Sequence, residues 1–117
     1  MARVLLVGAD HISRLILEQA GNTVRIADNF CQAHEHLRHS DADVVLTDLH
    51  MPESESLRHL AYLHTEFPLV KILVIVDDHD TVDFLRIRMS GADDVLRQPL
   101  PIKTLLDAVK QALEDTS

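Results

Sequence analysis

Apolar residues along this chain fall alternately into short continuous runs and into runs spaced three or four residues apart. Continuous runs at 3–7, 44–46 and 71–76 are typical of strands buried on both faces of a sheet. The segment 23–28 alternates apolar and polar positions, as an outer strand does, and 95–97 is a further short run. The pattern therefore predicts five strands.

Between these runs, apolar residues recur at the spacing of one buried helix face. Gly21 and Pro68 end two of the five expected helices. The expected buried stripes are Ile12, Leu15, Ile16 and Ala20; Phe30, Ala33 and Leu37; Leu57, Leu60, Ala61, His64 and Phe67; Val82, Leu85 and Met89; and Ile102, Leu105, Leu106, Val109 and Leu113.

Strict alternation of strands and helices predicts an α/β protein with a (βα)5 doubly wound, five-stranded parallel sheet. Right-handed crossovers place helices on both faces of such a sheet. Ligands then bind at the carboxyl ends of the strands, and Asp48 stands at that edge, after the run 44–46. We expect one domain over residues 1–117.

Composition and charge narrow the class of partner. The formal net charge of −8 opposes binding to a phosphate backbone, so we expect protein partners and no direct contact with nucleic acid. Cys31 is the single cysteine, which excludes an internal disulfide and fits a reducing compartment. The N-terminal apolar run is too short for a signal peptide or a membrane span, which predicts a soluble, cytoplasmic protein.

Two motifs add a family to this pattern. The segment LTDLHMP ends the third strand, and GADDVLRQP contains the fifth. With the five βα units, they resemble the flavodoxin-like receiver domain of bacterial response regulators in two-component phosphorelay systems, over essentially the whole chain. The resemblance implies that a histidine kinase transfers a phosphoryl group to the position of Asp48, with Mg²⁺ bound beside it.

Other positions depart from the family's pattern. Gly8 and Ala9 stand where the family has the acidic pair that binds the metal. Asp77 is matched to its Ser or Thr, Gln98 to its Lys before Pro, and Val95 to its switch aromatic. Phosphoryl transfer depends on cations that neutralise charge on the oxygens, so these losses act together.

The sequence therefore predicts an atypical receiver, or pseudo-receiver, that is not an enzyme and needs no cofactor. Asp48 is retained but idle in this reading. One alternative is a working receiver phosphorylated on Asp48, with Asp10 as a makeshift Mg²⁺ ligand. A weaker alternative is a metal or pH sensor that uses loop histidines such as His11, His50 and His79; Asp10, Asp48 and His50 are weak candidate ligands.

The fourth helix carries the candidate partner surface. Phe84 and Ile87 lie off the expected Val82, Leu85 and Met89 stripe, which predicts that they contact a partner beside Arg86 and Arg88. Burial of Phe84 in the core is the alternative. Candidate partners are a histidine kinase, an output domain, another regulator or a second copy of this domain.

Overall fold

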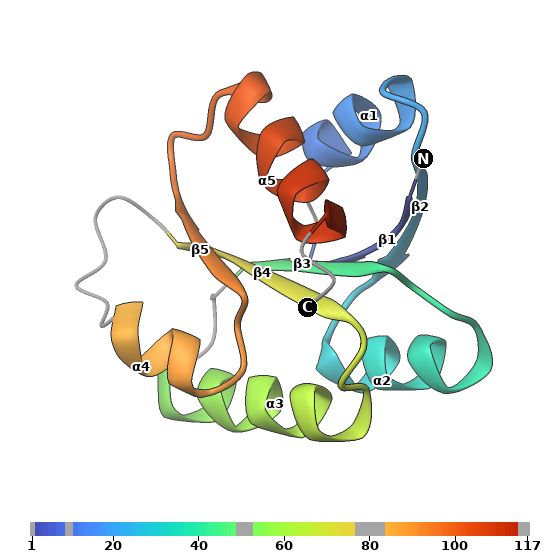
Figure 1. Cartoon of the computed structure of the whole chain (residues 1–117). Helices are drawn as coiled ribbons and strands as arrows, with labels where there is room; N and C mark the ends of the chain where they lie inside the picture. The colour runs from blue at the N-terminus through green and yellow to red at the C-terminus, as the bar shows by residue number, and fades with distance from the viewer. Residues whose placement is uncertain (1, 9–10, 49–52, 77–83, 115–117) are drawn as a thin grey trace.

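The structure of the chain is a computed structural model that describes residues 2–8, 11–48, 53–76 and 84–114, with only the backbone described at 11 and 53–56. Strands and helices alternate along these segments (Figure 1). The strands are β1 (Arg3–Val7), β2 (Thr23–Ala27), β3 (Val44–Asp48), β4 (Lys71–Val76) and β5 (Asp94–Arg97). The helices are α1 (His11–Gln19), α2 (Phe30–His39), α3 (Glu53–Glu66), α4 (Phe84–Met89) and α5 (Ile102–Glu114).

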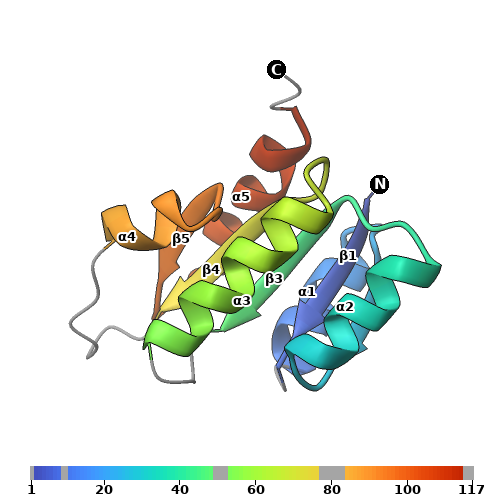
Figure 2. The same cartoon turned by 90° about the horizontal axis from the view of Figure 1, so that it is seen from below.

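The strands form one parallel sheet in the order β2-β1-β3-β4-β5. Helices α1 and α5 cover one face, and α2, α3 and α4 cover the other (Figures 1 and 2). This arrangement confirms the predicted doubly wound α/β fold. None of the described helices is long and apolar enough to cross a membrane.

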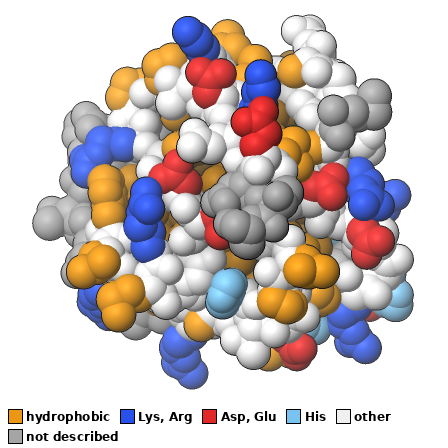
Figure 3. Space-filling view, viewed as in Figure 1, with side chains coloured by type: hydrophobic (Ala, Val, Ile, Leu, Met, Phe, Trp, Pro, Cys, Tyr) orange, Lys and Arg blue, Asp and Glu red, His pale blue; other side chains and the backbone are white. Residues whose placement is uncertain are grey.

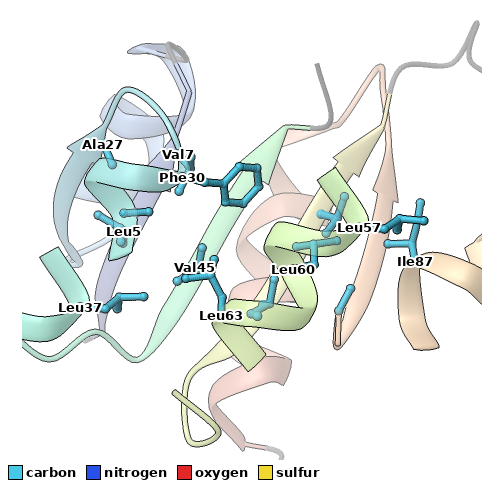
Figure 4. Close-up of a cluster of buried hydrophobic side chains, with 14 of the residues drawn as sticks. Leu5, Val7, Ala27, Phe30, Leu37, Val45, Leu57, Leu60, Leu63 and Ile87 are labelled. Atoms are coloured by element: carbon cyan, nitrogen blue, oxygen red, sulfur yellow. The ribbon is translucent and has the colours of Figure 1, made fainter. Parts of the chain in front are cut away.

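Successive side chains of the buried strands point to opposite faces and so build two cores. Leu5, Val45 and Val74 pack with residues of α2, α3 and α4, and Figure 4 shows several members of this cluster. Leu6 and Leu46, from the same strands, pack against α1 and α5 instead. The near-continuous apolar runs in the sequence reflect this burial on both faces.

The predicted buried stripes hold for some helices and fail for others. All three predicted residues of α2 are buried, as are Leu57 and Leu60 of α3 and Leu105 and Val109 of α5. In α3 the third buried residue is Leu63, whereas Ala61 and His64 are exposed. Ile102 and Ala20 are exposed as well.

Helix α1 turns a different side to the sheet than its sequence predicts. Ile12 and Leu15 are 71% and 58% exposed, while Leu17 and Ser13 are buried. Four apolar residues surround more than one side of this short helix, so spacing alone does not select the buried side. The small Ser13 lies one turn before Leu17, where the helix approaches the sheet.

Helix α4 corrects the predicted partner surface. Ile87 is fully buried and Phe84 is half-buried against the same core, whereas Leu85 and Met89 are 66% and 79% exposed. Val82 lies outside the described residues. The prediction that Leu85 and Met89 form the core and Ile87 faces a partner is therefore wrong.

Contacts with β5 explain this orientation of α4. The guanidinium of Arg97 lies 4.8 Å from the centre of the Phe84 ring, and Nη2 of Arg88 donates to Oδ1 of Asp94 at 2.8 Å. With Ile87 in the core, these contacts leave Leu85 on the outer side. The described part of the helix spans six residues, so the long-range contacts decide its orientation.

Charges of both signs are interspersed on the face of the molecule that Figure 3 shows. Lys and Arg side chains lie among Asp and Glu side chains there, with no broad basic patch. The described side chains of this face therefore form no basic patch of the kind that nucleic-acid-binding proteins carry.

Stability measurements on α4 test its orientation. We expect Ile87→Ala to lower the free energy of unfolding by about 2–5 kcal/mol, because it removes a buried side chain and leaves a cavity. The matched change Leu85→Ala, on the exposed side, should alter it by less than about 0.5 kcal/mol. Urea denaturation of both variants measures the two effects, and a larger loss for Leu85→Ala would contradict the orientation.

Candidate functional site

The candidate site lies at the carboxyl ends of the central strands, where Asp48 is the last residue of β3. Strand β3 lies between β1 and β4, with Thr47 level with Val7 and Asp48 level with Ile75. Because buried strands hold this register, Gly8, which follows Val7, lies next to Asp48. Asp48 itself is half-buried.

Gly8 lies where a side chain would contact Asp48. A Cβ atom built on Gly8 would lie 3.8 Å from Oδ2 of Asp48. Its backbone has φ +113°, and its N–H donates to the carbonyl oxygen of Ala27 at 2.9 Å. L-residues rarely adopt this φ, so this loop conformation favours glycine. Gly8 therefore contributes no side-chain oxygen beside Asp48.

Gln98 occupies the position that the resemblance gives to a lysine. Its N–H donates to the carbonyl oxygen of Val76 at 2.8 Å, so it lies directly beyond the paired ends of β4 and β5. Its Oε1 accepts a hydrogen bond from the N–H of Leu100 at 3.1 Å, across the cis Gln98–Pro99 bond. The side chain is therefore used within its own turn and brings no positive charge.

The end of β4 supplies no hydroxyl group. Val76, the last residue of the strand and one residue beyond the level of Asp48, is apolar and buried. Asp77 lies outside the described residues, and its side chain is a carboxylate. Val95, at the switch position, is half-buried and packs against the core that includes Ile87.

The described residues do not fit a magnesium site. Hard cations take several oxygen ligands, and among the described ends of the central strands β1, β3 and β4 the carboxylate is that of Asp48. No group of three or more His, Cys, Asp or Glu residues in the described segments could hold a metal ion. Ala9, Asp10, His50 and His79 lie outside the described residues, as does the side chain of His11.

Two histidines, His34 and His59, take part in packing between α2 and α3. His59 stacks on Phe30, with ring centres 4.8 Å apart, and His34 packs against Tyr62 and Phe67. The sequence could have indicated this packing for His34, because His34 follows Phe30 by four residues and a helix places both on the same side. These contacts assign His34 and His59 to the interface between the two helices.

A doubly wound parallel sheet with an acidic residue at its strand ends is the arrangement found in receiver domains of signalling proteins. The model of the response regulator receiver domain family matches residues 8–110. The chain therefore belongs to the response regulator receiver family, a component of two-component signalling. Receiver domains of this family interact with histidine kinases and output domains.

Curated relatives include two transcriptional regulators. The chain is 31% identical to the regulatory protein ZraR of Klebsiella oxytoca over 117 residues, covering 96% of this chain and 26% of that protein. It is 30% identical to the C4-dicarboxylate transport regulator DctD of Pseudomonas aeruginosa over 116 residues, covering 96% of this chain and 25% of that protein. The chain thus spans about a quarter of the length of these relatives.

Solved structures agree with the family. A response regulator from Thermotoga maritima superposes with a TM-score of 0.84 at 28% identity, covering 98% of this chain and 99% of that one. The beryllofluoride-activated NtrC4 receiver domain dimer superposes with a TM-score of 0.85 at 24% identity and full coverage of both chains. The second likeness concerns the fold alone.

Substitutions at Gly8 test the geometry beside Asp48. Gly8→Asn should cost about 1–3 kcal/mol of stability, because a side chain is strained at this φ. Gly8→Asp should cost more at neutral pH, because it places a second carboxylate near Asp48, and this excess should shrink as the carboxylates are protonated. Urea denaturation at two pH values measures both. A Gly8→Asp protein as stable as the wild type would contradict the geometry.

Proposed function

We propose that this receiver signals by protein contact and without phosphorylation of Asp48. The observation that carries the proposal is Gly8, which lies beside Asp48 in a conformation suited to glycine and has no side-chain carboxylate to bind a metal. The family's use of Asp48 depends on a divalent cation at this place. Gln98, which brings no cation, supports the same conclusion.

The residues that differ from the family's pattern remove groups that would neutralise negative charge on a phosphoryl group. A phosphoryl group spreads negative charge over its oxygens during transfer, and enzymes stabilise that charge with metal ions and fixed cations. Loss of one well-placed group of this kind typically costs about 3–4 kcal/mol of transition-state stabilisation. Gly8, Gln98 and Asp77, the residue matched to the family's Ser or Thr, together supply neither the expected cations nor a hydroxyl donor at the phosphoryl position.

The exposed side of α4 is the surface that we assign to partner contact. Leu85 and Met89 lie one turn apart, and both are largely exposed. Arg86 is also exposed on this helix, and Arg88 lies beside it, paired with Asp94. Apolar side chains surrounded by arginine are typical of surfaces that concentrate binding energy.

The partner of this surface is a histidine kinase, an output domain, another regulator or a second copy of the domain. The NtrC4 receiver was solved as a dimer, which provides a precedent for the last of these. Leu85 and Met89 replace the earlier candidates, since Ile87 is buried and Phe84 lies under Arg97.

Direct phosphorylation is the test of the proposal. Incubation with acetyl phosphate and Mg²⁺, followed by intact mass spectrometry, should give no phosphoryl adduct. A receiver that is phosphorylated under the same conditions serves as the positive control. An adduct that disappears in Asp48→Asn would refute the proposal and favour a working receiver with Asp10 as a metal ligand.

Affinity measurements should distinguish the role of Asp48 from that of the exposed side of α4. Asp48→Asn should leave affinity for a kinase or output domain that binds the wild type unchanged within about twofold, because Asp48 has no signalling chemistry in this proposal. Leu85→Glu and Met89→Glu should each weaken it at least about tenfold, since they place a charge in an apolar contact. Calorimetric titration measures the affinities. Loss of binding in Asp48→Asn with retention in both α4 variants would contradict the assignment.

A further inference from the structure

We propose that the outer edge of β2 binds an extended segment of a partner protein, in which an acidic side chain lies between two apolar ones. The segment would add a sixth strand to the sheet. Strand β2 is the outermost strand on the side of the sheet away from α4 (Figure 1). The inference is thus independent of the surface assigned to α4.

The free backbone groups of β2 are the first observation. The N–H of Thr23 donates to the carbonyl of Ala2, and the carbonyl of Ala27 accepts from Gly8, both at 2.9 Å. Alternate residues of a strand face alternate sides, so the N–H and C=O groups of Val24 and Ile26 point away from β1. No described residue hydrogen-bonds these groups, which is the arrangement that strand addition uses.

A groove runs beside this edge. A cavity of about 310 Å³ is lined by Arg25, Gln32, Glu35, His36, His39 and Ser40. A second cavity of about 130 Å³ shares three of these residues, Arg25, His36 and Ser40. Because they share these residues, the two cavities lie side by side between β2 and the C-terminal half of α2, and together they are called the groove below.

The charges in the groove favour a carboxylate. Arg25 is exposed and forms no ion pair with any residue in the described segments. Two carboxylates line the groove, and both already have partners. Oε1 of Glu35 lies 2.8 Å from Nε2 of His39, and Oδ2 of Asp41, in the second cavity, lies 4.0 Å from Nη1 of Arg3. That contact with His39 lowers the pKa of Glu35. An incoming carboxylate therefore meets a free guanidinium and the half-buried imidazole of His36.

The pleat of the sheet defines the rest of the ligand. Arg25 projects toward α2, whereas Val24 and Ile26 project to the other face, where they pack beside the α1 and α5 core. A residue paired beside Arg25 places its side chain in the groove, and its two neighbours lie beside Val24 and Ile26. The recognised pattern is therefore apolar, acidic, apolar.

A second copy of this chain fits the edge poorly. Pairing two β2 edges places the Arg25 side chains of both copies on the joined edge, and like charges in paired strands are destabilising. An acidic side chain in the added segment is instead attracted to Arg25. This difference favours a different protein as the occupant.

The test uses two short peptides and the amide spectrum of the full chain. Acetyl-Thr-Val-Glu-Val-Thr-amide should shift the amide signals of Val24 and Ile26 in a saturable manner at millimolar concentration. The matched peptide with Lys in place of Glu should bind at least about tenfold more weakly. Arg25→Glu should reverse this preference, because it inverts the charge in the groove.

Strand addition also requires the outward-facing backbone N–H and C=O groups of β2, which can be tested separately. Val24→Pro removes an outward N–H without breaking a hydrogen bond to β1, so it should keep the fold and lose the peptide. Should that variant fail to fold, N-methylation of alternate peptide residues replaces it: methylation of one alternate set should abolish binding and methylation of the other should not. The proposal is overturned by absence of shifts at Val24 and Ile26, by equal binding of both peptides, or by binding that neither block reduces.

Discussion

Burial of β1, β3 and β4 on both faces is the constraint on which the rest of this domain depends. Nearly every residue of these three strands is buried, so a shift of register by one residue would move apolar side chains between the two cores. Fixed register aligns the carboxyl ends of the strands. The positions of Gly8 and Asp48 beside each other, and of Gln98 at the adjoining strand ends, follow from that alignment.

The same burial explains which parts of the fold could be predicted from the sequence. Continuous apolar runs identified the central strands, because strands covered on both sides leave little room for polar residues. Helix α2 was predicted correctly since its apolar residues lie on one side. Helices α1 and α4 carry apolar residues on several sides, and there the contacts made in three dimensions decide. The small buried Ser13 and the pairing of Arg97 with Phe84 are not visible in residue spacing.

The candidate site could likewise be predicted only in part from the sequence. The identities of Gly8 and Gln98 show from the sequence alone that a carboxylate and a cation are missing. The left-handed backbone of Gly8 and the hydrogen bond from Leu100 to Gln98 depend on loop conformation, which no periodic pattern encodes. Sequence and structure agree at both positions. The loop beside Asp48 has a conformation suited to glycine, and the side chain of Gln98 is hydrogen-bonded within its own turn.

The contacts of α4 bear on how a receiver of this kind would carry information. A modification shifts a conformational equilibrium only by interacting differently with the two states. Among the described residues, α4 is held by Ile87 in the core, by Arg88 on Asp94 and by Phe84 under Arg97. The turn that follows α4 also packs closely on α3, where a Cβ on Gly91 would lie 2.6 Å from Cβ of His64. These contacts run to β5, α3 and the core, and Val95 offers no ring to link them to the strand ends. The exposed side of α4 is therefore presented by packing of the helix against β5, α3 and the core.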